Sequence, residues 1–286
     1  MILRPTIALA AGFWLLTAAL SKAEPIGPLT RPDAATTPIV PVVLFGADGR
    51  RSAEDFAREH SLNAGALRRR YRASGVVVCG NARGAGQLTL VNSVVTTAAH
   101  VFFDEAGRPR ALGGRCRFIV EIGRTTIAVA IDPTSIVSGS RDPYAETPAR
   151  DWAVARLERA IAGAVPYRLG QAGDDMAVRF AARGHVDWGG GVELALEQCR
   201  LRQTLDVDAG GAREVAFDCD AGQGASGGAL LDKAGERLVA IFVGYRSSTP
   251  DLAAPFSGRH YNFAVTVEGA FRRAIEAEAG ATAAER

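Results

Sequence analysis

Residues 219–229 read Cys-Asp-Ala-Gly-Gln-Gly-Ala-Ser-Gly-Gly-Ala, and a single hydroxyl, on Ser226, stands between glycines in this stretch. Glycines lack a Cβ atom, so the chain can turn tightly here and a ligand can approach the backbone. The pattern suits a nucleophile beside an oxyanion hole, with the N–H groups of Gly224 and Ser226 as donors. A glycine-rich surface loop with a solvated serine is the alternative, and other parts of the chain must decide between them.

A nucleophilic serine needs a base, and the base needs a third group to orient it. Four histidines are available, at positions 60, 100, 185 and 260. Only His100 closes an apolar, strand-like run, where two alanines allow a tight turn that aims the imidazole off the strand end. Asp151 opens another apolar strand, and a carboxylate buried there would hold the imidazole in one tautomer. Asp104 and Asp142 are alternatives to Asp151, but both lie in turns typical of solvated residues.

Three motifs in this order resemble a known family. Thr-Ala-Ala-His at 97–100, Asp-Trp-Ala-Val at 151–154 and Gly-Ala-Ser-Gly-Gly at 224–228 are similar to the catalytic signatures of chymotrypsin-like (trypsin-fold) serine proteases. The similarity is greatest to the bacterial secreted trypsin-like and glutamyl-endopeptidase-like branch, and it runs from about residue 74 to about residue 277. It implies a serine endopeptidase with His100, Asp151 and Ser226 as its triad, a polypeptide substrate and no cofactor.

Short apolar strands with glycine or polar breaks recur along the chain and predict an all-β fold of barrels or sandwiches. We expect them at 75–79, 87–91, 94–97, 117–122, 126–131 and 153–157, and then at 177–183, 192–205, 214–217, 229–231, 238–243 and 261–265. Together with the resemblance, these strands indicate two six-stranded antiparallel β-barrels, at 74–160 and 161–265. Residues 266–286 are predicted to add a C-terminal helix, capped by Thr266, and a tail.

The N-terminal part has a different character. Residues 1–23 have an early arginine, an apolar core and a small-residue cleavage site, as in an export signal peptide. Residues 24–73 begin with a series of prolines and end in a basic cluster, so we interpret them as a propeptide-like or linker leader, with a helix starting at Ser52. The protein is therefore expected to be secreted or periplasmic.

The formal net charge is only +2, and no basic tract exists beyond one short cluster, so nucleic acid is not expected as a partner. No stable membrane insertion is expected, because the apolar run near the start is short for a membrane span. We expect a monomer. Nothing in the sequence has the spacing of a zinc site, so no metal is predicted.

Four cysteines in an exported chain favour disulfides and allow three pairings. The preferred pairing is Cys79 with Cys116 and Cys199 with Cys219, because each pair then closes a local loop. The first loop would enclose the candidate base, and the second would end just before the serine turn.

The resemblance also suggests which residues bind substrate. Val243, Gly244 and Tyr245 resemble the strand that pairs with substrate backbone and forms one wall of the primary pocket. Asp220, six residues before the serine, aligns with the pocket-base position that gives trypsin its preference for Arg or Lys, although it can be structural in relatives. No histidine lies in the strand at 238–245, which weakens a preference for acidic residues.

One position departs from the family pattern. Many trypsin-like zymogens have, just before the serine, an aspartate that pairs with a new N-terminal ammonium, but Ala225 stands here. We therefore expect the oxyanion hole to form without that switch.

Two other functions remain open. The first is a catalytically inactive homologue that binds a partner. The second is an esterase that uses the same serine, although the α/β-hydrolase order requires a histidine after Ser226, where only His260 is available.

Overall fold

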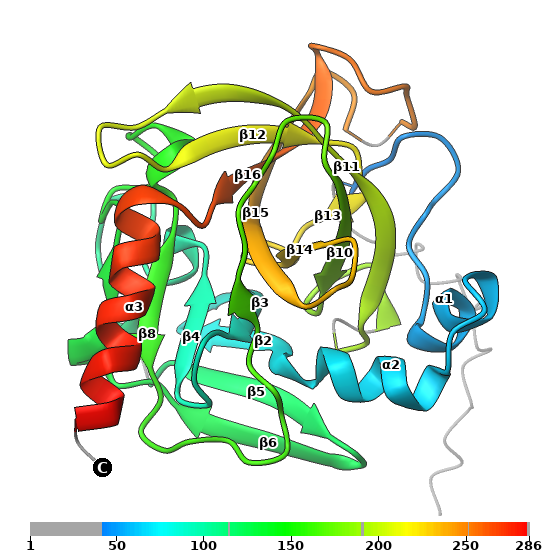
Figure 1. The fold of residues 1–286 in the computed structure, drawn as a ribbon. Helices are drawn as coiled ribbons and strands as arrows, with labels where there is room; N and C mark the ends of the chain where they lie inside the picture. Colours follow the sequence, from blue (N-terminus) through cyan, green and yellow to red (C-terminus); the bar gives the residue numbers. More distant parts are fainter. Residues whose placement is uncertain (1–41, 114, 190–191, 251, 285–286) are drawn as a thin grey trace, which may run out of the picture. The chain divides into compact units, whose positions relative to one another are not determined.

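The computed structural model describes residues 42–284 apart from residues 114, 190–191 and 251. The predicted signal peptide lies outside the described residues. Within the described part, the chain forms two seven-stranded, mostly antiparallel sheets, one two-stranded sheet, three α-helices and several short 3₁₀ helices (Figure 1). No described helix has the length and apolar character that a membrane crossing requires.

The first sheet comes from residues 74–156. Its strands are β2 (Ser74–Cys79), β3 (Ala82–Leu88), β4 (Val94–Thr97), β5 (Arg117–Ile122), β6 (Thr125–Ala130), β7 (Val137–Ser138) and β8 (Ala153–Arg156), in the order β6-β5-β2-β3-β4-β8-β7. An antiparallel bridge between Ile131 and Leu157 joins the end of β6 to the end of β8. The hydrogen bonds Asp132 N to Arg156 O and Glu158 N to Ala130 O, each 2.9 Å, flank this bridge and bring the sheet round into a barrel.

The second sheet contains β9 (Arg168–Leu169), β10 (Ala177–Ala182), β11 (Ala195–Val207), β12 (Arg213–Phe217), β14 (Ala229–Asp232), β15 (Arg237–Ser247) and β16 (His260–Thr266). Its order is β14-β10-β11-β12-β16-β15-β9, and β14 also pairs with β15. The six longer strands therefore form a closed antiparallel barrel. Phe180, Phe217 and Phe242 contact one another inside it, with ring centroids 5.7–5.8 Å apart.

The predicted all-β class is confirmed, and eleven of the twelve predicted strands are present, most of them within one or two residues of their bounds. The expected strand at 87–91 is displaced, because the observed β3 begins at Ala82 and ends at Leu88. Leu90 has φ +60°, and the Val91 N–H donates to Thr89 O at 2.7 Å, so these residues form a turn. Two glycines within β3 hid its strand character, since glycine has low β propensity.

Residues 42–73 contain several short elements of regular structure. They form β1 (Val42–Val43), α1 (Ala53–Glu59), α2 (Ala64–Arg70) and a 3₁₀ turn at Tyr71–Ala73. Ser52 caps α1 as predicted, and its hydroxyl oxygen accepts the Asp55 N–H at 3.1 Å. Phe56 and Tyr71 are almost fully buried, so these helices cover part of the apolar core.

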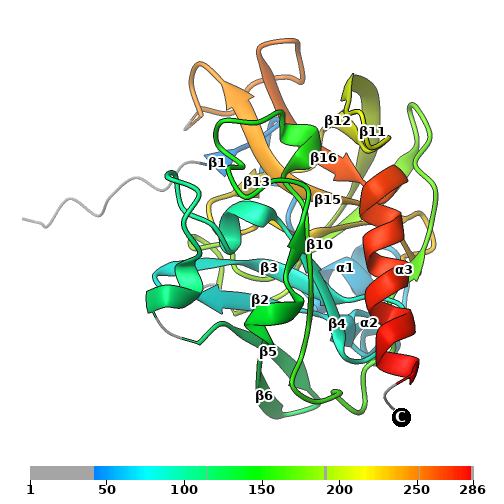
Figure 2. The ribbon, with the colours of Figure 1, turned by 90° about the vertical axis from the view of Figure 1, so that its left-hand side faces the viewer.

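The C-terminal helix α3 (Gly269–Ala284) follows β16 (Figure 2) and contacts β4 and β8 of the first sheet (Figure 1). Phe271 and Ile275 form its buried face, as predicted, and Phe271 stacks on Trp152 with centroids 4.9 Å apart. The Thr266 cap was wrong, because Thr266 ends β16 and its hydroxyl oxygen accepts the Arg213 N–H at 3.0 Å. The helix therefore joins the end of the second sheet to the first.

Both predicted disulfides are confirmed, Cys79–Cys116 and Cys199–Cys219. The first joins the end of β2 to the residue before β5, and the second joins β11 to the segment after β12. Each bridge therefore joins a strand to a segment next to another strand of the same sheet.

Candidate functional site

His100 and Asp151 are brought together by the pairing of two strands. His100 lies in the 3₁₀ turn Ala99–Val101 that follows β4, and Asp151 immediately precedes the short link to β8. Because β4 and β8 are antiparallel neighbours, with Thr97 opposite Ala153, the end of one strand lies beside the start of the other. The two candidate residues therefore come from adjacent strand ends.

The contact between these two residues is direct. Asp151 Oδ2 lies 2.6 Å from His100 Nδ1, and Asp151 Oδ1 accepts the His100 backbone N–H at 3.0 Å. The carboxylate is buried, with 7% of Asp151 exposed. A carboxylate at Nδ1 favours the tautomer that carries its proton there, which leaves the Nε2 lone pair free to accept a proton.

The two alternative acids occupy other places. Asp104 accepts the N–H groups of Ala106 and Arg108, both at 2.9 Å, within its own turn. The hydrogen bonds from Arg108 hold the pKa of Asp104 below its ordinary value. Asp142 lies in the loop before Asp151, and its backbone N–H donates to the Ser140 hydroxyl at 2.9 Å.

The other histidines have structural partners or surroundings. The His60 ring packs against Phe56 at the end of α1, with centroids 4.2 Å apart and the rings tilted by 42°. His260 Nδ1 lies 2.9 Å from the Ser247 hydroxyl, and its Nε2 lies 2.9 Å from Leu44 O. His185 is fully buried against Phe180, and burial and the nearby Arg50 lower its pKa to about 3.

Ser226 lies on a turn between β13 (Ala221–Gly222) and β14. Gly224 and Gly227 have φ +88° and +89°, a conformation that glycine adopts without strain. The Gly227 N–H donates to Phe242 O at 2.6 Å, which fixes the turn to β15. A Cβ atom on Gly227 would meet Thr97 and Ala98, so the serine turn lies directly against the strand end that leads to His100.

Within the described residues, the Ser226 hydroxyl makes no hydrogen bond to the His100 ring. Such bonds are often long in enzymes without substrate. The structure thus joins His100 to Asp151 by hydrogen bonds and places the turn of Ser226 beside them through backbone packing.

The amides of the serine turn divide into two groups. The N–H groups of Ala225, Gly227 and Gly228 donate to backbone carbonyls at 3.2, 2.6 and 2.8 Å. Those of Gly224 and Ser226 have no acceptor among the residues that the structure describes. An unpaired backbone N–H is unfavourable unless water or a ligand accepts it, so these two amides are available to bind an anionic oxygen.

A second contact fixes the turn at Gly224. Gln223 O accepts the Val186 N–H at 2.9 Å. Gly184 and Gly224 approach so closely that a Cβ on either would meet the carbonyl oxygen of the other. The loop at 183–188 therefore supports the peptide that ends in the Gly224 amide.

A cavity of about 400 Å³ opens beside the serine. Its lining includes the three predicted wall residues, and the full set is Gly222, Gln223, Gly224, Ser226, Phe242, Val243, Gly244, Tyr245 and Phe263. At Gly244 the absence of a Cβ lets the Phe263 ring pack directly against the strand, since a Cβ would come within 2.7 Å of that ring. None of these lining residues carries a charge.

Asp220 is not among the residues that line this cavity. Its carboxylate accepts the N–H of Phe45 at 2.7 Å and the N–H of Gly49 at 2.5 Å. Burial raises its pKa. Asp220 thus has the family's spacing to the serine, and its side chain anchors the N-terminal segment.

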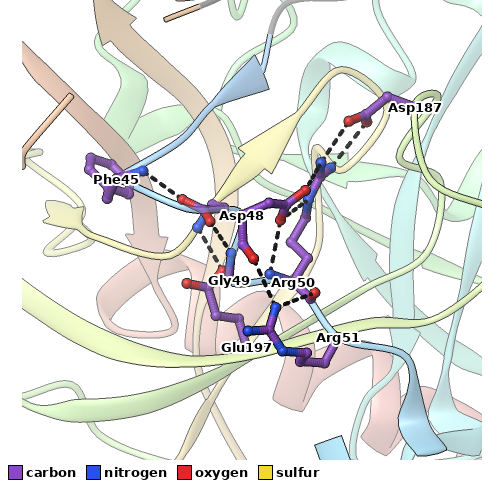
Figure 3. A network of polar contacts seen from close by, with 8 residues as sticks. Phe45, Asp48, Gly49, Arg50, Arg51, Asp187 and Glu197 are labelled. Atoms are coloured by element: carbon purple, nitrogen blue, oxygen red, sulfur yellow. Dashed lines mark hydrogen bonds and ion pairs between the residues drawn. The ribbon is translucent and has the colours of Figure 1, made fainter. Parts of the chain in front are cut away.

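Sequence reasoning missed the polar network that surrounds this anchor. Figure 3 shows Arg50 between Asp48 and Asp187, with Phe45, Gly49 and Glu197 close by. The only sequence signal was the turn-forming Ala-Asp-Gly at 47–49 before Arg50, inside what we interpreted as a leader. Among the described residues, no group of three His, Cys, Asp or Glu side chains is arranged to hold a metal.

Comparison with known proteins bears on the fold. The structure is similar to that of a Glu endopeptidase, with a TM-score of 0.61 and 16% identity over 83% of this chain and 100% of that chain. More distant matches include an HtrA-type protease with a tripeptide (TM-score 0.49, 17% identity, 71% of this chain and 59% of that one). Another is the MamO protease domain from Magnetospirillum magneticum (TM-score 0.48, 14% identity, 68% of this chain and 92% of that one). No protein-family profile and no curated protein matches the sequence. The two barrels, their order in the chain and the likeness to the Glu endopeptidase show that this protein has the chymotrypsin-like serine protease fold.

Proposed function

We propose that the protein is an exported serine endopeptidase that hydrolyses peptide bonds through His100, Asp151 and Ser226. The observation that carries the proposal is the combination of a buried carboxylate on His100 Nδ1 with two unpaired amides on the turn of Ser226. The first supplies an oriented base, and the second supplies donors for an oxyanion.

The chemistry is acyl transfer. His100 Nε2 accepts the proton of Ser226 as Oγ attacks the substrate carbonyl carbon. The N–H groups of Gly224 and Ser226 stabilise the negative oxygen that forms, and Asp151 stabilises the imidazolium. His100 then protonates the leaving amine, and a water molecule, activated by the same imidazole, releases the acyl group. These steps need no cofactor.

The cavity suggests which side chain precedes the scissile bond. Phe242, Val243 and Phe263 give it an apolar lining, and its residues offer no charge to pair with a charged substrate group. Burying an unpaired charge costs roughly several kcal/mol of free energy, so charged side chains are disfavoured in this cavity. We propose a preference for an uncharged, apolar residue, in place of the basic residue that a pocket-floor Asp220 would select.

Labelling with a fluorophosphonate tests the triad. We expect the reagent to modify Ser226 in the full-length protein, and we expect Ser226→Ala to abolish labelling. His100→Ala should lower kcat for a peptide substrate by about 10⁴-fold or more, because an unactivated serine is a weak nucleophile. The matched control is His60→Ala, whose ring lies at the end of α1 and should leave labelling unchanged.

Other outcomes would identify the alternatives. A folded protein that neither reacts with the fluorophosphonate nor cleaves peptides would be an inactive binding homologue. Activity that disappears in His260→Ala but survives in His100→Ala would contradict the proposed triad. Export is tested separately, by mass spectrometry of the N-terminus of the protein recovered outside the cytoplasm.

A further inference from the structure

The segment of residues 42–50, called here the N-terminal strap, contacts the serine turn from one side. β1 pairs with β13, with Val42 opposite Gly222 and Val43 opposite Ala221. Asp220, the residue before β13, accepts the strap's N–H groups at Phe45 and Gly49. The backbone that leads into Gly224 is therefore held by the strap at three consecutive residues, 220–222.

The strap also holds the loop on the other side of Gly224. Arg50 donates to Asp187 Oδ1 and Oδ2 at 3.1 and 2.7 Å, and its guanidinium lies 5.3 Å from the centre of the Trp188 ring. Asp48 fixes the same guanidinium from within the strap, through bonds of 3.0 and 2.8 Å (Figure 3). Arg50 is only 5% exposed. A buried, two-pronged arginine–carboxylate pair is geometrically specific, so the loop is held in one place.

These two contacts converge on a single peptide. The loop that Arg50 holds donates the Val186 N–H to Gln223 O and packs Gly184 against Gly224. The β1–β13 pairing ends at Gly222, one residue before Gln223. The orientation of the Gln223–Gly224 peptide decides where the Gly224 N–H points.

We propose that the N-terminal strap positions the oxyanion hole, with Arg50 and Asp220 as its positioning residues. The inference rests on the proposed function, since it assigns the Gly224 amide to a catalytic role. Preorganised donors stabilise a transition state because they need no reorganisation during the reaction. The side chain next to the serine, Ala225, is fully buried and carries no polar group that could hold the turn instead.

Replacement of the buried arginine tests the proposal. Arg50→Met removes the bonds to Asp187 while it keeps an unbranched apolar chain. The matched control is Arg213→Met, which breaks another two-pronged pair, with Glu268 at 2.7 and 3.0 Å, whose partners lie away from the serine turn. Arg50→Lys keeps the charge but not the fork geometry, so its effect should be intermediate.

Three measurements separate positioning from stability. The first is kcat and KM for a peptide substrate. The second is the affinity of a peptide boronic acid, which forms a tetrahedral adduct with the active-site serine. The third is amide hydrogen exchange over residues 219–226. In Arg50→Met we expect kcat to fall about tenfold to a hundredfold, less than the loss of a donor, with KM changed less than threefold. Boronic acid affinity should fall in parallel, and exchange should accelerate at 219–226.

The control defines the outcome that overturns the proposal. Arg213→Met should lower the melting temperature while kcat and exchange at 219–226 stay as in the parent. If both variants lose kcat in proportion to their loss of stability, or if exchange at 219–226 is unchanged in Arg50→Met, the strap does not position the turn. If the parent protein neither cleaves peptides nor reacts with a fluorophosphonate, the proposed function fails, and the exchange measurement still decides whether the strap holds the turn.

Discussion

Glu197 provides the most informative perturbation of stability. Its Oε2 accepts the Asp220 N–H at 2.8 Å, and its side chain is largely buried beside the strap. Burial, and next the nearby Asp220 carboxylate, raise the pKa of Glu197 from 4.5 to about 9. In Glu197→Gln the amide oxygen can still accept the Asp220 N–H, so the substitution removes the ionisation and keeps the hydrogen bond.

The sign follows from proton linkage. Between pH 4.5 and about 9 the folded protein keeps a proton on Glu197 that the unfolded chain has lost, so the free energy of unfolding falls as pH rises through this window. A pH of about 7.5 is roughly three units above the ordinary pKa of a glutamate. At about 1.36 kcal/mol per pH unit, the free energy of unfolding falls by about 4 kcal/mol between these two pH values. We halve this to about 2 kcal/mol because the side chain keeps some contact with solvent, which corresponds to a melting temperature about 4–8 °C higher in Glu197→Gln.

Thermal unfolding at a series of pH values measures the effect. The parent and Glu197→Gln should have equal melting temperatures near pH 4.5, and the difference should grow steadily toward pH 9. Glu105→Gln, in an exposed turn, is the control and should follow the parent at every pH. A difference between the parent and Glu197→Gln that stays constant with pH would refute the buried, protonated state of this carboxyl group.

Four further predictions concern the site and the core. Asp151→Asn should lower kcat about 10⁴-fold in a peptide cleavage assay, because the imidazole loses its tautomer and orientation; a loss below tenfold would contradict the role. Gly224→Ala should lower kcat by about 10²–10³, since φ is +88° and the new Cβ meets a carbonyl oxygen, whereas Gly258→Ala, with open space around it, should retain activity. Phe271→Ala, at a fully buried position, should reduce the free energy of unfolding by about 3–5 kcal/mol in denaturant titrations, and an unchanged midpoint would argue against the stacked core. Phe263→Ala should enlarge the cavity and shift cleavage toward larger apolar residues in a peptide panel that varies only the residue before the scissile bond, and an unchanged profile would exclude this cavity as the specificity pocket.

Most of the barrel framework could be predicted because its strands are short, apolar and rich in β-branched residues. The strands at Val94–Thr97 and Arg117–Ile122 have the predicted bounds. The bounds of β3 could not be predicted, because its glycines have low β propensity and serve close packing instead. The start of α1 at Ser52 could be predicted from its cap, but the strap and α2 could not. Charged residues are frequent there, and the burial of these segments depends on partners that are distant in the sequence.

Some residues of the candidate site could also be placed from the sequence, and others could not. His100 and Asp151 could be placed because each is next to a strand with a clear apolar pattern, and the pairing of β4 with β8 then brings them together. Asp220 could not be placed, because spacing along the chain says nothing of which N–H groups a buried carboxylate finds in space. Its partners come from the opposite end of the described chain, where no local pattern indicates them.

The contacts of Asp220 with Phe45 and Gly49 join positions 175 and 171 residues apart. Contacts so remote in sequence form late, since a long loop must close before they contribute any stability. A nascent polypeptide interrupted before residue 220 lacks the carboxylate that binds Phe45 and Gly49 of the strap, however well its first sheet has folded. The turn that carries Ser226 therefore acquires this support only after residue 220 has been synthesised and has packed against a segment made much earlier.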